Sequence, residues 1–188
     1  MRIIAGELKG RRLTTPRGDR TRPTADQVRI ALMDTLAPRL PEARVLDLFA
    51  GAGGVGLEAL SRGAAEATFV EQDARAVGAL RDNVAALGVG ARTRVRRADV
   101  LREIPALHAA GERFDVVFLD PPYDTDLVAT TLLALSGGGL LLPEGLVIAQ
   151  HFTKRAPAAT IGRLATFRTR RFGETTLTFY RTAPGPTP

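Results

Sequence analysis

Short apolar runs alternate with helix-length segments along most of this chain, and this alternation constrains the fold more than any other feature. Apolar strands that alternate with helices are typical of a parallel sheet covered by helices on both faces. The pattern therefore predicts an α/β fold. The apolar runs are residues 45–49, 67–71, 94–96, 114–119 and 146–149, and the helix-length segments are 55–62, 74–87, 100–109 and 127–135.

The two ends of the chain depart from this pattern. Residues 2–14 alternate loosely and contain two glycines, which predicts a short basic hairpin, and helical spacing runs from residue 24 to about 37. Residues 164–170 and 175–180 flank a Phe-Gly-Glu turn and predict an antiparallel hairpin. Residues 183–188 are rich in proline, and we expect them to form a disordered tail.

Length and composition exclude several classes of protein. A chain of 188 residues suits one domain, and the absence of cysteine excludes disulfides, thiolate zinc sites and cysteine nucleophiles. The start of the chain lacks the apolar run of a secretory signal. The uncharged stretch 127–142 contains three glycines and stops at Pro143, so it predicts a helix, a turn and a strand start rather than a membrane span. We therefore expect a cytoplasmic protein, with no metal site and with a monomer as the default state.

Positive charge is concentrated at the two ends of the chain. Residues 1–29 carry a net charge of +5 and residues 151–188 a net charge of +6, whereas residues 30–150 carry −5. Localised positive charge favours a polyanionic partner, and arginine, which supplies nearly all of it, can pair with phosphates and stack on bases. Charge alone leaves two alternatives open: a nucleic-acid surface, or a solvated basic surface.

A glycine turn follows the first apolar run. Gly51, Gly53 and Gly56 match the G-x-G-x-x-G fingerprint between a predicted strand and a predicted helix, and Glu71 lies 20 residues after Gly51. Glycines let the backbone approach a ligand, and an acid at the end of the second strand can accept both hydroxyls of a ribose. Nicotinamide dinucleotides and S-adenosylmethionine (SAM) both fit this arrangement.

Two aspartates favour SAM. Asp47 precedes the glycines, where it could accept a hydrogen bond from the methionine ammonium group, and a nicotinamide site has no cation at that place. Asp99 follows the third apolar run, where it could accept the amino group of adenine. The alternative for Asp99 is the N-cap of the next helix, and both roles can hold together.

The sequence Asp120-Pro121-Pro122-Tyr123 directly follows the run 114–119. Loops at the carboxyl ends of strands line the ligand crevice of an open α/β sheet, so this loop should face the glycine turn. The lone pair of an aromatic amine is delocalised into the ring, and a site that methylates it should accept both N–H bonds. The Asp120 carboxylate and the Pro121 carbonyl offer two acceptors, Pro122 helps to stiffen the loop, and Tyr123 can stack on a base.

With these residues in place, the chain resembles the class I Rossmann-like methyltransferases, and more narrowly the RsmD-type family of 16S ribosomal RNA (guanine-N2) methyltransferases. This resemblance implies a mostly parallel sheet of about seven strands with an antiparallel C-terminal hairpin. The motifs that carry it are Met1-Arg2-Ile3-Ile4 with Gly10-Arg11, Arg22-Pro23-Thr24 with Asp26 and Val28-Arg29, Phe49-Ala50-Gly51 through Glu58 to Ala64, and Asp120 to Tyr123.

The resemblance also implies roles for particular residues and an RNA partner. The implied partner is 16S RNA or an assembling 30S particle. Residues 1–40 would form a basic RNA-binding extension, and residues 41–182 the methyltransferase domain. The implied cofactor site is Asp47, Phe49, Gly51, Gly53, Glu71 and Asp99, the catalytic loop is Asp120, Pro121, Pro122 and Tyr123, and the RNA-facing arginines are Arg11, Arg12, Arg22 and Arg29.

Two positions depart from the pattern of the family. Ala52 stands where a small hydroxyl residue is expected, a change that still permits the turn. Gln150-His151 follows the fifth apolar run, where relatives have a glutamate, and no role is assigned to Gln150. We interpret His151 as a surface histidine at a strand end, with a general base as the alternative.

Three other functions remain open at this point. A DNA adenine methyltransferase would use the same loop chemistry, but it normally needs an added target-recognition region. An oxidoreductase that uses NAD would fit the glycines and leave Asp47 and the loop 120–123 unexplained. A ribosome assembly factor that binds RNA without turnover would tolerate the loss of Glu71 or Asp120, and both are present.

Overall fold

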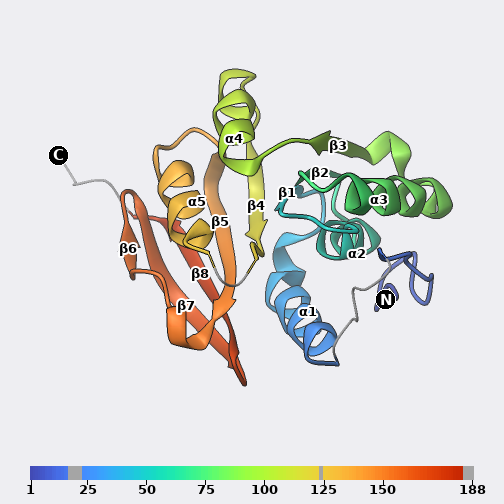
Figure 1. Cartoon of the computed structure of the whole chain (residues 1–188), viewed down its shortest axis with the longest axis horizontal. Helices are drawn as coiled ribbons and strands as arrows, with labels where there is room; N and C mark the ends of the chain where they lie inside the picture. Colours follow the sequence, from blue (N-terminus) through green and yellow to red (C-terminus); the bar gives the residue numbers. More distant parts are fainter. Residues whose placement is uncertain (17–22, 123–124, 184–188) are drawn as a thin grey trace.

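A computed structural model of the chain describes residues 1–16, 23–122 and 125–183. Its centre is a sheet of eight strands in the order β3-β2-β1-β4-β5-β8-β7-β6 (Figure 1). The strands from β3 to β5 are parallel, and β8, β7 and β6 are antiparallel to their neighbours. The bounds are β1 Arg44–Leu48, β2 Glu66–Glu71, β3 Thr93–Arg97, β4 Phe114–Leu119, β5 Leu141–Phe152, β6 Thr160–Ile161, β7 Leu164–Phe172 and β8 Thr175–Thr182.

Helices cover both faces of the sheet, as the alternating pattern predicts. Helices α1, α2 and α3 pack on one face and share a core with Val45, Phe69 and Ile148. Helices α4 and α5 pack on the other face against Leu46, Val147 and other strand residues (Figure 1). The helices are α1 Pro23–Leu36, α2 Gly54–Ser61, α3 Ala74–Leu87, α4 Val100–Ala109 and α5 Leu127–Ser136.

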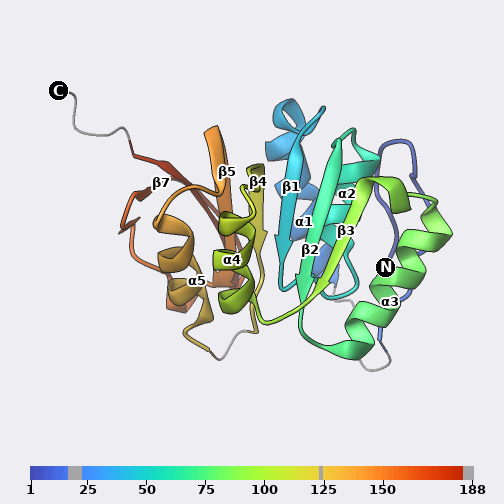
Figure 2. The same ribbon diagram turned by 90° about the horizontal axis from the view of Figure 1, so that it is seen from above.

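The strand order reverses beside β1. The chain passes from β1 to β2 on one side and later returns to β4 on the other side of β1. The carboxyl ends of all five parallel strands lie along one edge of the sheet (Figure 2). This edge, at such a reversal, is where open α/β sheets bind ligands.

The prediction of about seven strands is close to the observed eight. The additional strand, β6, has only two residues, and they pair with Ala165 and Leu164 of β7. Strand β5 also begins five residues earlier than the apolar run 146–149. Pairing with β4 jumps from Leu141 to Leu146, so an irregularity in the ladder carries the strand past residues 142–145.

The predicted N-terminal hairpin is present as a short one. Residues 2 and 12 make an antiparallel bridge, and backbone hydrogen bonds run from Ile3 N–H to the Arg11 carbonyl, from Gly10 N–H to the Ile3 carbonyl and from Leu13 N–H to the Met1 carbonyl, at 2.9–3.0 Å. Glu58 accepts hydrogen bonds from the N–H groups of Ile4 and Ala5 at 2.7 and 3.0 Å. Ile3 and Leu13 are buried in the same core as α1 and α2, so that core continues across the predicted domain boundary at residue 40.

Replacing Glu58 with alanine should lower the free energy of unfolding by about 3 kcal/mol. Glu58 is fully buried, and its Oε1 also accepts from Arg62 at 2.9 Å. The substitution would leave a cation and two backbone donors without their acceptor. Urea denaturation measures the change, and the exposed Glu174→Ala variant should lie within about 0.5 kcal/mol of the wild type. Equal midpoints for the two variants would contradict this role for Glu58.

The helices of the described residues are all too short or too polar to cross a membrane.

Candidate active site

The glycine turn after β1 combines an accessible backbone with close packing. Gly51 has a φ of 55°, and a Cβ added to it would meet no described atom within 4 Å. A Cβ on Gly53 would lie 2.4 Å from Leu80 Cδ1, and one on Gly56 would lie 2.3 Å from the ring of Phe69. Gly51 therefore leaves space for a ligand, Gly53 lets Leu80 of α3 pack against the turn, and Gly56 lets α2 pack tightly on the sheet.

Glu71 stands at the end of β2 and holds the turn. Its Oε2 accepts the N–H of Gly51 at 2.9 Å, and its Oε1 accepts the N–H of Asp73 at 2.8 Å. Each carboxylate oxygen can accept a second hydrogen bond. The half-buried carboxylate is thus oriented by the backbone and still has acceptor capacity for two neighbouring hydroxyls, as the predicted role on a ribose requires.

Asp47 is a buried acid, and no described residue places a cation beside it. Its side chain is 2% exposed, and its Oδ2 accepts the N–H of Gly56 at 2.9 Å. Burial raises the pKa of Asp47 to about 8, with the charges of Asp120 and Glu71 adding to the shift and the Gly56 N–H opposing it. The structure therefore brings three predicted site acids close enough to influence one another, and a cationic ligand would relieve their repulsion.

Binding of SAM at pH 7 should release close to one proton. Asp47, with its pKa near 8, is mostly protonated in the free protein, and an ammonium group beside it would lower that pKa and drive the proton off. Calorimetric titration in phosphate and in Tris buffer measures the release through the difference in apparent enthalpy. The Asp47→Asn variant should bind more weakly and release almost no proton. Equal release by both proteins would assign the proton to another group.

Asp99 fulfils the N-cap alternative. It precedes α4, and its Oδ1 accepts the N–H of Arg102 at 3.1 Å. The carboxylate is exposed and retains further acceptor positions, so the predicted contact with adenine remains a prediction.

Phe49 directly follows β1 and has a φ of 59°. It is partly buried against the hydrophobic core that lies beneath α4.

Asp120 follows β4 on the same edge as the glycine turn. Its carboxyl is half-buried, and its Oδ2 accepts from Gln150 Nε2 at 3.0 Å. Burial raises the pKa of Asp120 to about 7, and the hydrogen bond from Gln150 opposes the shift. Pro121 is buried and Pro122 exposed, whereas Tyr123 lies outside the described residues. Because Oδ2 is engaged by Gln150, Oδ1 is the carboxylate oxygen left to face a substrate.

Gln150 is the functional candidate that sequence reasoning left without a role. It lies in β5, two residues before the strand ends and beside β4, and its amide fixes the rotation of the Asp120 carboxyl. The interpretation of His151 as a surface histidine is wrong. His151 is 2% exposed, donates from Nδ1 to the Phe152 carbonyl and accepts at Nε2 from Thr178, both at 2.8 Å. Burial lowers the pKa of His151, and both ring nitrogens are engaged, so the structure does not favour a general base there either.

The arginines predicted to face RNA divide into two groups. Arg11 and Arg12 are exposed, although Arg11 also donates to the carbonyl of Ala86. Arg22 lies outside the described residues. The prediction for Arg29 is wrong: it is 6% exposed and donates to the Arg2 carbonyl at 2.8 Å and to Asp26 at 3.0 Å. Its helical position turns it toward α2, where it supports the N-terminal segment.

The donor set fits SAM better than a nicotinamide dinucleotide. A buried acid without a partner cation, Asp47, stands behind the glycine turn, and Glu71 is oriented at its rim. Asp120 provides an acceptor at the neighbouring strand, where a methyl acceptor would be held. Together with the mixed sheet, these features define a class I methyltransferase that uses SAM.

Comparisons with known proteins agree with this class. The family model described as "Conserved hypothetical protein 95" matches residues 1–181. Ribosomal RNA small subunit methyltransferase D of Escherichia coli is 40% identical over 147 residues, which cover 78% of this chain and 72% of that protein. YlbH of Bacillus subtilis is 36% identical over 184 residues, which cover 96% of this chain and 98% of that protein. The solved structure of yhhF from Escherichia coli superposes with a TM-score of 0.83 at 33% identity, covering 98% and 99% of the two chains.

The chain therefore belongs to the family of ribosomal RNA small subunit methyltransferase D.

Proposed function

We propose that this protein transfers a methyl group from SAM to the exocyclic N2 amine of a guanine in 16S ribosomal RNA, in the cytoplasm and during assembly of the small subunit. The observation that carries the proposal is the Asp120 carboxyl, held by Gln150 at the carboxyl end of β4 on the edge that also bears the glycine turn. The family and the basic N-terminal segment support ribosomal RNA as the substrate.

The cofactor site would be formed by Asp47, Glu71 and the turn at Gly51. Asp47 would accept from the ammonium group, and Glu71 would accept from the ribose hydroxyls with the lone pairs that Gly51 and Asp73 leave available. When bound, SAM supplies an electrophilic methyl group on a sulfonium. The predicted contact of Asp99 with adenine would complete this site.

The loop at Asp120 would act on the methyl acceptor. Its second oxygen, Oδ1, would accept one N–H of the base amine, and the carbonyl of Pro121 would accept the other. Two acceptors pull the nitrogen toward tetrahedral geometry and direct its lone pair at the methyl group. The Asp120 carboxyl has a pKa of about 7, so it can also hold the proton that the amine loses after transfer.

Guanine is favoured over the other bases by the family rather than by the loop. Cytosine, adenine and guanine all carry an exocyclic amine that two acceptors could hold. RNA is likewise favoured over duplex DNA by the family. The related proteins in Escherichia coli and Haemophilus influenzae are named for small-subunit ribosomal RNA.

Transfer of radiolabel from SAM tests the proposal. The acceptors are naked 16S RNA, 30S particles from cells without the enzyme, and duplex DNA, followed by analysis of the labelled nucleoside. Label as N2-methylguanosine in RNA or in particles is the expected result. Label as N6-methyladenine or in DNA would support methylation of an exocyclic amine and contradict guanine in 16S RNA as the substrate. Cofactor binding without transfer to any acceptor would favour an assembly factor that binds RNA without turnover.

A further inference from the structure

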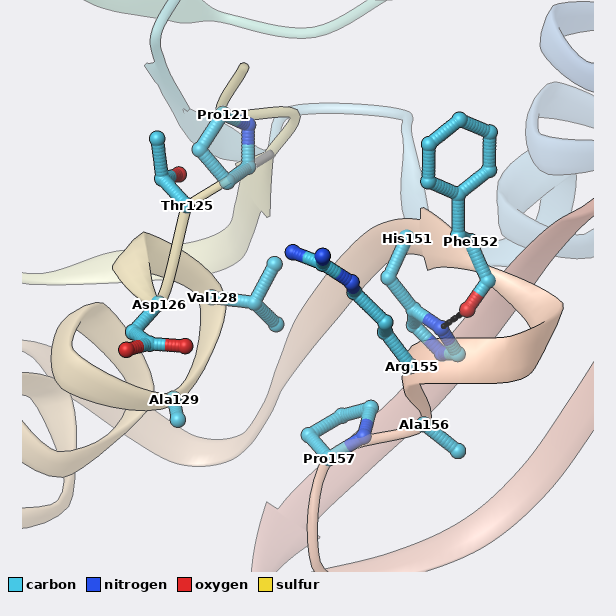
Figure 3. A pocket seen from close by; sticks show the side chains of 10 residues that line it. All are labelled: Pro121, Thr125, Asp126, Val128, Ala129, His151, Phe152, Arg155, Ala156 and Pro157. Atoms are coloured by element: carbon cyan, nitrogen blue, oxygen red, sulfur yellow. Dashed lines mark hydrogen bonds between the residues drawn. The ribbon is translucent and has the colours of Figure 1, made fainter. Parts of the chain in front are cut away.

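A pocket of about 410 Å³ lies beside the Asp120 loop, between the start of α5 and the end of β5 (Figure 3). This volume lies in the range of small-molecule binding sites. Its walls are mostly apolar, and one arginine extends into it. The residues that matter for the argument are Pro121, Asp126, Val128, His151, Arg155 and Pro157.

The pocket is separate from the amine-binding position and adjoins it. Successive residues of a strand point to opposite faces, so Gln150 bonds Asp120 on one side of the sheet and His151 lines the pocket on the other. Pro121, the residue after Asp120, also lines the pocket. Consecutive Cα atoms are about 3.8 Å apart, so the two spaces share one short loop.

Arg155 has no partner among the residues that the structure describes. Its side chain is exposed, and its guanidinium extends over the pocket toward Thr125 and Pro121 (Figure 3). Among the described residues it forms no hydrogen bond, ion pair or ring contact. An unpaired guanidinium over an apolar hollow is suited to a ligand that has both a flat face and hydrogen-bond acceptors.

We propose that this pocket binds the base of an RNA nucleotide next to the methylated one. The proposal rests on the proposed function, because the strand must already present its target amine to Asp120. Val128 and Pro157 offer apolar surface for the face of the base, and Arg155 offers donors to ring nitrogens or a carbonyl oxygen. The carboxylate of Asp126 at the rim can accept from a base amine and disfavours a phosphate there. RNA enzymes commonly read bases that are splayed out from the strand, and this pocket would hold such a base.

Two substitutions test the pocket in two different ways. Arg155→Ala removes the cation, and Ala156→Trp places a large ring at an exposed position of the pocket lining. Each has a matched control outside the lining: Lys154→Ala in the same short helix, and Ala158→Trp at an exposed position two residues further on. The measurements are KM for the RNA or particle substrate, the affinity for that RNA in filter binding, and the affinity for SAM.

Arg155→Ala and Ala156→Trp should each raise KM for RNA about tenfold and weaken RNA binding equally, since the loss of one stacked base has this magnitude. Affinity for SAM should stay unchanged, and both controls should stay within about twofold of the wild type. Wild-type KM in both pocket variants would overturn the inference while leaving the proposed function intact. If the wild type binds RNA but transfers no methyl group, the proposed function fails. The RNA affinities of the pocket variants then decide alone whether the pocket binds a base. If the wild type binds no RNA, both fail.

Discussion

Replacing Asp120 with alanine should yield a folded protein that binds SAM normally and transfers methyl groups about 10²- to 10³-fold more slowly. The carboxyl lies at the end of β4 and is held by Gln150, so its removal takes away an acceptor already oriented for the amine. No backbone group described in the structure depends on the Asp120 side chain for its hydrogen bond. Radiolabel transfer gives the rate, and calorimetry gives the cofactor affinity.

Asp120→Asn is the matched control, because it keeps the shape and one acceptor oxygen. It should retain more activity than alanine, and its rate should vary less with pH. Asp120 has a pKa of about 7, raised by burial, so the wild-type carboxyl is protonated below pH 7 and becomes a full acceptor above it. The wild-type rate should therefore rise between pH 6 and pH 8. An alanine variant within tenfold of the wild type would remove Asp120 from the chemistry.

Replacing Arg11, Arg12 and Arg22 together with alanine should weaken RNA binding about 100-fold in 0.1 M salt. Each phosphate contact on a single strand contributes about 0.7 to the slope of log K against log salt, so three lost contacts flatten the slope by about 2. Arg11 and Arg12 are exposed, and Arg22 lies outside the described residues. Filter binding at four or five salt concentrations measures both the affinity and the slope.

A second triple variant, of Arg39, Arg113 and Arg163, removes the same net charge at the opposite edge of the sheet. These residues stand before β1, β4 and β7, at the ends farthest from the catalytic loop. Their replacement should change the slope of log K against log salt by less than the contribution of one phosphate contact, about 0.7. If both variants flatten the slope equally, the effect comes from net charge rather than from the N-terminal surface. If neither variant changes the slope, RNA must bind at another surface, for example at exposed arginines such as Arg168.

Local sequence signals predicted the elements of the fold closely. Helices α3 and α4 and strand β4 have the bounds that the pattern predicts. Asp73 and Asp99 cap the two helices, and Gly88 ends the first of them in a left-handed conformation. These signals lie within a few residues of the boundary that they define, so periodicity and capping together were sufficient.

Contacts between distant residues could not be predicted in the same way. Gln150 and Asp120 are 30 residues apart, and only the pairing of β4 with β5 makes them neighbours. One signal was available: each residue directly follows an apolar run, the two runs are consecutive, and parallel neighbours bring such ends together. His151 is buried beside Thr178 and Arg29 beside Arg2, and each pair is 27 residues apart in the sequence. The residue types histidine and arginine do not by themselves indicate such burial.

The site acids were predicted because their positions follow from the ends of strands. Asp47, Glu71 and Asp120 each lie at the carboxyl end of a strand of the parallel sheet, so a correct sheet was enough to bring them together. The raised pKa values of Asp47 and Asp120 follow from burial, and they required the structure. Their assigned roles in binding and catalysis remain predictions that the experiments above test.

The way the first residues are anchored has a consequence for synthesis on the ribosome. The N-terminal segment is held by Glu58 and Ser61, which lie 53 or more residues later, and by Asn83, which pairs with Thr14 across 69 residues. Asn83 also donates to the carbonyl of Ala52 in the glycine turn at 3.0 Å. This segment is synthesised before its partners, so it cannot dock fully until α3 has emerged from the ribosome. Completion of the glycine turn and docking of the N-terminal segment are thereby coupled to the arrival of the same helix.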